Sequence, residues 1–335
     1  MKKLFYLFIA MTLILGLTVT VSADNHADEE YRISVVLKAT NSDYWKSVQA
    51  GAEQAAEDMG VEVSVVGPSN ETQVMQQINL LEDQISRMVD GLVVAPLRPS
   101  AALNVLKKAV DRGIPVVTID TDAEFEGKTS FAGTGNYEAA MQAGEYMAEK
   151  MNGEGKVAII RGAAGDYIFD QRTEGFMAAI EDTDIEVVAV QPADSERGKA
   201  VNVMQNILQT YPDIKGVYGE NDEMALGALR ALKSANAAEG VTIIGFDGSP
   251  DAIKSIRNGE LTATIQQDSY NIGYTGVELM VKTLNGEEVP EVVPVQTNVI
   301  DGDNVDESIK DLTKAFSRER LETIFGEELM EELLD

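Results

Sequence analysis

Short runs of consecutive apolar residues recur along the chain at nearly even spacing, with helical patterns between most of them. These runs do not alternate with polar residues, so strands formed by them must be covered on both faces, as in parallel sheets. The predicted strands are 33–37, 61–66, 91–95, 115–119, 131–133, 157–160, 185–190, 216–218, 241–245 and 261–265.

The segments between these strands carry apolar stripes at steps of three and four residues, which are typical of amphipathic helices. The clearest stripe is Val74, Met75, Ile78, Leu81, Ile85 and Met88, and other helices are predicted to begin near Tyr44, Ser100, Tyr137, Gln171, Lys199, Glu223 and Pro250. Repeated strand–helix–strand units build a doubly wound parallel sheet with right-handed crossovers. Because ten strands exceed one comfortable sheet, we predict an α/β protein with two close-packed lobes of the same construction.

Polar side chains follow the last apolar residue of most predicted strands. In open α/β sheets ligands bind outside the carboxyl ends of the strands, where such side chains converge. Helix capping accounts for Ser42, Asp194 and Asp222, but it does not account for long or charged groups, so we predict a binding cleft. The predicted cleft residues of this kind are Lys38, Asp120, Thr134, Arg172, Ser195, Asn221, Asp247 and Gln267.

The charges in this predicted cleft nearly cancel, since Lys38 and Arg172 balance Asp120 and Asp247. A near-neutral pocket favours a neutral ligand with many hydroxyl groups, because charges buried without partners are costly. Carboxylates accept hydrogen bonds from hydroxyl groups, while lysine, arginine and amides donate them. The expected ligand is therefore a sugar or a polyol.

Three aromatic residues lie where they can pack against the C–H faces of a sugar ring, namely Tyr44, Trp45 and Phe246. Trp45 also continues a helical core stripe with Val48 and Ala52, so a purely structural role stays open for it.

Composition excludes several classes of function. The formal net charge is −29, which repels phosphate backbones and anionic membranes, so nucleic-acid binding is not expected. The chain has no cysteine and one histidine, His26, so disulfides and a zinc site of His and Cys ligands are excluded. We expect a monomer without a metal or a cofactor.

The first residues read as an export signal. Lys2 and Lys3 precede an apolar run, and Ala23 ends a small-x-small pattern of the kind that signal peptidases cut. We predict a signal peptide at 1–23, cleaved after Ala23, an acidic linker at 24–30, and a periplasmic mature protein. The run is also about as long as the ~18 residues of a membrane anchor, which is the alternative.

Several motifs in this chain resemble those of the ribose- and allose-binding periplasmic proteins, which feed sugar ABC transporters. The motifs of the ribose type are QPAD at 191–194, NVMQN at 202–206, NDEMALGALRAL at 221–232, GFDG at 245–248 and ATIQQ at 263–267. The segments 36–38 and 95–97, together with Trp45, look more like the allose type. The similarity runs from about 31 to 300 and leaves the acidic, helical extension at 301–335 uncovered.

The resemblance implies ligand contacts at Lys38, Tyr44, Trp45, Asp120, Arg172, Asn221, Phe246, Asp247 and Gln267. The chain departs from the family at Ala95 and Thr121, and at Ser195, which replaces a large aromatic residue. Losing an aromatic wall puts specificity for ribose or allose in doubt.

By similarity, the chain crosses between the lobes three times, near Thr134, Gln267 and Val295. The implied N-terminal lobe is 31–134 plus 268–294, and the C-terminal lobe is 135–267 plus 295–300. The lobes of such proteins close around a ligand, and a membrane permease recognises the closed form.

Two other interpretations of the function stay open. The same ligand chemistry would serve a sensing module that docks on a chemoreceptor or a histidine kinase. Asp120 and Asp247 could also form the paired carboxylates of a glycosidase. A nicotinamide enzyme is disfavoured, because Glu138 stands where a dinucleotide-binding loop at Gly133 would need its third glycine.

Overall fold

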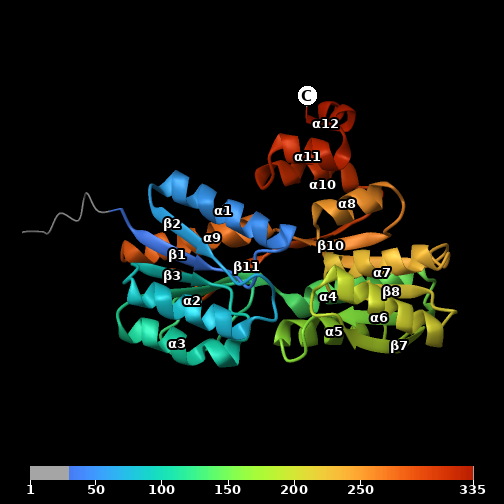
Figure 1. Cartoon of the computed structure of the whole chain (residues 1–335), viewed down its shortest axis with the longest axis horizontal. Helices are drawn as coiled ribbons and strands as arrows, with labels where there is room; N and C mark the ends of the chain where they lie inside the picture. Colours follow the sequence, from blue (N-terminus) through green and yellow to red (C-terminus); the bar gives the residue numbers. More distant parts are fainter. Residues whose placement is uncertain (1–29, 335) are drawn as a thin grey trace, which may run out of the picture. The chain divides into compact units, whose positions relative to one another are not determined.

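The computed structural model describes residues 30–334. The predicted signal peptide at 1–23, its cleavage after Ala23 and all but the last residue of the predicted linker lie outside the described residues. Two six-stranded sheets form the framework of the described chain, and we call the lobes built on them the N-terminal and the C-terminal lobe (Figure 1).

The sheet of the N-terminal lobe has the strand order β11-β5-β4-β3-β1-β2. Every pairing in this sheet is parallel. Its strands are β1 (Arg32–Val36), β2 (Glu62–Val66), β3 (Gly91–Val94), β4 (Val116–Ile119), β5 (Ser130–Thr134) and β11 (Val292–Val295).

The sheet of the C-terminal lobe has the order β12-β10-β9-β8-β6-β7. Its pairings are parallel except for β12, which runs antiparallel to β10 at the edge. Its strands are β6 (Glu154–Arg161), β7 (Asp184–Pro192), β8 (Gly216–Gly219), β9 (Thr242–Asp247), β10 (Ala263–Gln267) and β12 (Thr297–Ile300).

The order of the strands shows how the chain connects the two sheets. It passes from the first sheet to the second after β5, returns after β10, and leaves again between β11 and β12, which makes three crossings within the described residues. The carboxyl ends of the parallel strands of both sheets are therefore the places where chain segments of the two lobes can meet.

Helices cover both faces of each sheet (Figure 1). In the N-terminal lobe, α1 and α9 pack on one face, and α2 and α3 pack on the other. In the C-terminal lobe, α6, α7 and α8 cover one face and α4 covers the other, while α5 contributes its first turn to the former core and Phe176 to the latter. These helices are α1 (Asp43–Met59), α2 (Val74–Ser86), α3 (Pro99–Asp111), α4 (Asn136–Lys150), α5 (Tyr167–Ala179), α6 (Arg197–Thr210), α7 (Asp222–Ser234), α8 (Pro250–Arg257) and α9 (Ser269–Leu284).

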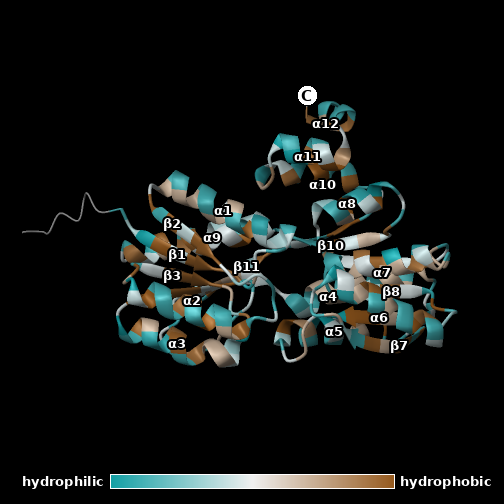
Figure 2. Cartoon of the chain, in the orientation of Figure 1, coloured by the Kyte–Doolittle hydropathy of each residue, from teal (hydrophilic) through white to brown (hydrophobic). Residues whose placement is uncertain are grey.

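Each of the ten apolar runs corresponds to a strand, but β11, β12 and α9 were not predicted. The two strands lie at sheet edges, and their residues are mostly exposed or half-buried, so they lack the continuous apolar run of a central strand. Figure 2 shows apolar residues concentrated in the sheets and on the helix faces that cover them.

The extension after β12 contains α10 (Val305–Asp311), a 3-10 turn at Leu312–Lys314, α11 (Arg318–Phe325) and α12 (Glu327–Leu334). Its buried apolar residues join the core of the C-terminal lobe beside α8, where Ile309 and Leu321 are fully buried together with Ile253. Burial of apolar surface, which stabilises by about 25 cal/mol per Å², therefore holds the extension to this lobe.

No helix among residues 30–334 combines the length and the apolar character needed to span a bilayer.

Candidate functional site

A small cavity, which we call the central cavity, is lined by residues of both lobes. Of the eleven residues predicted to bind ligand, it brings together eight, while Phe246, Thr134 and Ser195 lie outside its lining. The lining consists of Lys38, Tyr44, Trp45, Glu71, Asp120, Ile168, Phe169, Arg172, Asn221, Asp247 and Gln267.

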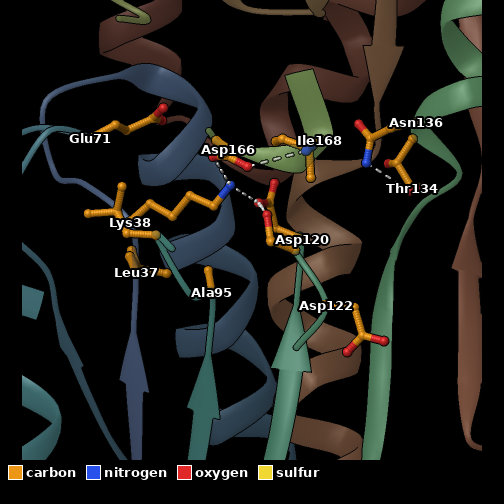
Figure 3. A network of polar contacts seen from close by, with 12 residues as sticks. Leu37, Lys38, Glu71, Ala95, Asp120, Asp122, Thr134, Asn136, Asp166 and Ile168 are labelled. Atoms are coloured by element: carbon orange, nitrogen blue, oxygen red, sulfur yellow. Dashed lines mark hydrogen bonds and ion pairs between the residues drawn. The ribbon is translucent and has the colours of Figure 1, made fainter. Parts of the chain in front are cut away.

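Lys38 follows β1 and is only 1% exposed. Its Nζ lies 3.1 Å from Asp120 Oδ2 and 3.4 Å from Asp166 Oδ2, so one cation links the two lobes (Figure 3). Burial by itself lowers the pKa of Lys38, but the attraction of Asp120, Asp166 and Glu71 outweighs burial and raises the pKa above its ordinary value. The lysine therefore stays charged.

Asp120 follows β4 with φ of 60°, in the left-handed region that non-glycine residues rarely occupy. This turn presents its carboxylate to the cavity, where it accepts hydrogen bonds from Tyr44 Oη at 2.6 Å and Thr121 Oγ1 at 2.8 Å. Burial raises the pKa of Asp120, but Lys38, Tyr44, Thr121 and Arg172 together lower it below its ordinary value. Asp120 is thus a fixed anionic acceptor.

Arg172 projects from α5 and is 3% exposed. Its Nε donates to Asn136 Oδ1 at 2.8 Å, and its Nη1 donates to the backbone oxygen of Glu220 at 2.6 Å. The guanidinium carbon lies 3.7 Å from the centroid of the Phe246 ring, which is a cation–π contact. Phe246 is fully buried beneath Arg172 and lies outside the lining of the central cavity, so its predicted ligand contact stays a prediction.

Asp247 ends β9 with a strained φ of 126°. It accepts a hydrogen bond from Gln267 Nε2 at 2.8 Å and lies 4.0 Å from Arg172 Nη1. Burial raises the pKa of Asp247 well above its ordinary value, although Arg172 opposes the shift. Gln267 orients this carboxylate and lies at the end of β10, directly before the chain crosses back to the N-terminal lobe.

Helix capping at the start of α7 differs from the sequence-based prediction. Asn221, and not Asp222, is the N-cap, and its Oδ1 accepts from Met224 N at 2.9 Å. Asp222 is buried and accepts from Ser249 N and Thr264 Oγ1, which ties α7 to β10 and the start of α8. Since Oδ1 of Asn221 is used in the cap, its Nδ2 remains as the donor to the cavity.

The other two capping predictions were also incomplete. Ser42 does occupy the N-cap position of α1, but its side chain makes no capping hydrogen bond. Asp194 does not cap a helix, and its carboxylate accepts from Lys199 Nζ at 2.8 Å.

Two acidic residues of the site were missed by sequence reasoning, Glu71 and Asp166. Glu71 Oε1 accepts from Trp45 Nε1 at 2.9 Å, and burial raises the pKa of Glu71. Asp166 pairs with Lys38 and caps α5 through Ile168 N. Glu71 lies in the polar loop after β2, so extending the strand-end rule to the second strand would have found it.

Glu71 and Asp166 change the charge balance predicted for the cleft. With four carboxylates near Lys38 and Arg172, the fully ionised site carries more negative than positive charge. Burial raises the pKa of Glu71 and of Asp247, which shows that both carboxyl groups lie in desolvated positions.

Thr134 and Ser195 lie near the central cavity without lining it. Thr134 is 5% exposed at the end of β5, and its hydroxyl has no hydrogen-bond partner among the described residues. Ser195 lines a second, smaller cavity, which we call the side cavity. Its lining includes Asn70, Glu71, Asp194, Glu196 and Asn221.

Comparison with known proteins gives consistent matches. Residues 33–288 match the periplasmic binding protein domain. The ribose import binding protein of Salmonella typhimurium is 37% identical over 300 residues, which cover 90% of this chain and 98% of the relative. The D-allose-binding periplasmic protein of Escherichia coli is 33% identical, over 84% of this chain and 91% of its own.

Solved structures share the fold. An ABC transporter solute-binding protein from Agrobacterium vitis, solved with bound D-fucose, is 32% identical with a TM-score of 0.80, over 82% of this chain and 97% of that chain. One from Actinobacillus succinogenes with bound D-allose is 30% identical with a TM-score of 0.79, over 83% of this chain and all of the other. The predicted architecture of two parallel-sheet α/β lobes is confirmed.

Proposed function

Because the chain belongs to the periplasmic binding protein family, we propose that it captures a neutral monosaccharide or polyol between its lobes and delivers it to an ABC-type permease. The observation that carries this proposal is the central cavity, which buried donors and acceptors from both lobes line together.

The chemistry of the lining supports a hydroxylated ligand. Asp120 and Asp247 are acceptors for ligand hydroxyl groups, whereas Arg172, Asn221 and Gln267 supply donors. Tyr44, Trp45 and Phe169 add aromatic surface for the C–H faces of a sugar ring. Each hydrogen bond between a ligand hydroxyl and a charged side chain contributes a net free energy of about 1.5–3 kcal/mol to binding.

The position of the site supports a closing mechanism. Ligand contacts come from both sheets, and Gln267 and Asp247 lie next to a hinge crossing. A ligand that contacts both lobes favours the closed form by its extra affinity for that form. The permease would then distinguish loaded from empty protein by the relative placement of the lobes.

The proposed location is the periplasm, reached by a signal peptide at 1–23 that is cleaved after Ala23. Two observations support it: the pattern of basic, apolar and small residues at the start of the chain, and the family, whose relatives include a periplasmic protein. We further propose that the protein acts as a monomer.

A thermal-shift and calorimetric screen with pentoses, hexoses, inositols and sugar alcohols tests the function, because a ligand of the folded state raises the melting temperature. Asp247→Ala should abolish the shift seen with the best ligand, and the isosteric Asp247→Asn should weaken binding at least about tenfold. Asp213→Ala, which removes an exposed carboxylate paired with Lys156 on the same lobe, is the control. Equal ligand responses of Asp247→Ala and the control would exclude Asp247 from the site.

A further inference from the structure

A third cavity, which we call the hinge cavity, lies where both lobes, two of the chain crossings and the C-terminal extension meet. Its lining comes from the start of α1, the loop between β9 and α8, the crossings after β10 and between β11 and β12, and the segment 311–316 of the extension. The volume open to the centres of water-sized molecules is about 130 Å³. One water needs about 10–15 Å³ by this measure, so a solute of roughly ten non-hydrogen atoms fits.

Two buried hydroxyl groups of the N-terminal lobe line the hinge cavity without a partner. Ser47 on α1 is 7% exposed, and Ser269 at the start of α9 is 9% exposed. Neither hydroxyl forms a hydrogen bond within the described residues. Because buried polar groups in proteins nearly always have a partner, both hydroxyls are available to a molecule bound in this cavity.

Three side-chain amides of the crossing segments also line the hinge cavity, namely Gln266, Gln296 and Asn298. Gln266 and Asn298 pair across β10 and β12. The hydroxyl of Thr297 accepts a hydrogen bond from Gln142 of α4, so the alternation of side chains along a strand turns Asn298 to the opposite face, toward α8 and the extension. The three amides form no side-chain hydrogen bond within the described residues, and each offers both donors and acceptors.

The acidic side chains of the extension and of the helix starts around the cavity are already occupied. Asp43 pairs with Arg320, and Asp311 pairs with Lys314. Asp268 accepts hydrogen bonds at the start of α9, where it is the N-cap. The free groups are therefore neutral hydroxyls and amides, which suit a neutral solute with several hydroxyl groups.

A solute in the hinge cavity would contact parts of the molecule that move relative to one another when the lobes rotate. Ser269 belongs to the N-terminal lobe, whereas Asn298 and Phe316 belong to the C-terminal lobe and its extension. Tyr44 and Gln267 line both the hinge cavity and the central cavity, so the two spaces share a wall. A solute that contacts both lobes favours the arrangement in which its contacts exist, and it thereby favours any ligand that binds the same arrangement.

We propose that the hinge cavity is an effector site for a small neutral polyol, which holds the lobes in the arrangement described here. The binding of the polyol goes beyond the proposed function, whereas its effect on the central cavity rests on that function. The extension supplies one wall of the site, including Leu312 and Phe316, and it lies outside the residues 33–288 that match the family domain.

Calorimetric titration with erythritol, ribitol and sorbitol tests the site, with the central cavity saturated by the monosaccharide that binds in the screen. One of these polyols should bind beside the monosaccharide. Asn298→Phe, which places a large side chain at the exposed edge of the cavity, should weaken polyol binding at least about tenfold, as the loss of one or two hydrogen bonds does. Val292→Phe is the matched control, because Val292 is an exposed strand residue outside the lining, and it should bind the polyol as the wild type does.

The coupling has its own measurement. The polyol should raise the affinity for the monosaccharide by about fivefold or more, and by linkage the monosaccharide should raise the affinity for the polyol by the same factor. Asn298→Phe should remove this effect, whereas Val292→Phe should keep it. If Asn298→Phe fails to fold, Ser269→Ala should weaken polyol binding by about two- to tenfold.

The outcomes separate the two proposals. A polyol that only displaces the monosaccharide, that binds wild type and Asn298→Phe equally, or that does not bind at all would overturn the effector site and leave the proposed function intact. Polyol binding that leaves the affinity for the monosaccharide unchanged would overturn the effector role. Absence of binding by any sugar would overturn the proposed function, and titration of the sugar-free protein with the same polyols would still test the hinge cavity.

Discussion

Lys38 is the buried cation that joins the two lobes, with its ammonium group between Asp120 and Asp166. Removal of this charge would leave two buried carboxylates without a cation, which typically costs about 3–5 kcal/mol. Lys38→Met should therefore lower the free energy of unfolding in urea by about that amount.

Two further variants control this prediction. Lys108→Met, which breaks the half-exposed pair with Glu82, should cost less than about 1 kcal/mol. The double variant Lys38→Met/Asp166→Asn should recover part of the stability, since it removes one of the two unpaired charges. A loss in Lys38→Met no larger than in Lys108→Met would show that the buried pairs contribute little.

Glu220 is a fully buried carboxyl beneath the site, and burial raises its pKa from the ordinary 4.5 to about 7. The folded protein binds this proton more tightly than the unfolded chain does. The stability contributed by Glu220 is therefore present below pH 4.5 and is lost as the pH rises through about 7.

Glu220→Gln cannot lose that proton. Relative to the wild type, the free energy of unfolding of the variant should therefore rise by roughly 3 kcal/mol between pH 4.5 and pH 8, because the pKa of Glu220 is 4.5 in the unfolded chain and about 7 in the folded protein. Urea unfolding of both proteins across this range measures the difference, and parallel curves would show that Glu220 titrates normally. The contact of Arg172 is with the backbone oxygen of residue 220, so the variant keeps it.

At the scale of elements, the close packing of α1 on α9 depends on two glycines. A Cβ at Gly51 would lie 1.9 Å from the backbone oxygen of Tyr270, and one at Gly273 would lie 1.9 Å from that of Val48. These backbones therefore approach more closely than any side chain permits. This contact positions α1, whose first turn carries Tyr44 and Trp45 into the central cavity.

Gly51→Ala should destabilise the protein by at least about 1–3 kcal/mol, because the helices must move apart. Gly198→Ala is its control, since this helical glycine has open space around it, and alanine there should be neutral or stabilise by up to about 1 kcal/mol. Thermal unfolding of both variants gives the comparison. A Gly51→Ala protein as stable as the wild type would mean that α9 adjusts freely.

At the scale of the whole molecule, the C-terminal extension connects the lobes as well as covering one of them. It is held by apolar contacts to the C-terminal lobe, while Arg320 on α11 reaches Asp43 of the N-terminal lobe, 2.5 Å from Nη2 to Oδ1. Asp43 begins α1, directly before Tyr44. An ion pair between lobes stabilises whichever arrangement brings its partners together.

Arg320→Gln should therefore speed ligand release, by about two- to fivefold for a partly exposed pair worth less than about 1 kcal/mol. Trp45 is the only tryptophan of the chain and lines the cavity, so its fluorescence in stopped flow measures the rate. Arg257→Gln is the control, because the pair of Arg257 with Asp306 joins the extension to its own lobe. Equal release rates in the two variants would argue against a link between lobes, and the difference should vanish in about 1 M salt.

The local sequence determined the central strands and most of the helices, because continuous apolar runs and stripes at three- and four-residue steps reflect burial that each element needs by itself. Lys38, Asp120 and Asp247 could be predicted as site residues for a similar reason, since the ends of parallel strands meet at one edge. The edge strands β11 and β12 were not predicted from the sequence, because a half-exposed strand needs no continuous apolar run.

Only the tertiary structure decided which polar groups contact one another. It placed Phe246 under Arg172 rather than in the cavity, gave the cap of α7 to Asn221, and brought Glu71 and Asp166 to Lys38. These outcomes depend on contacts between residues far apart in the chain. Hydrogen bonds and ion pairs act over about 3–4 Å, so the spacing of residues along a sequence does not specify them.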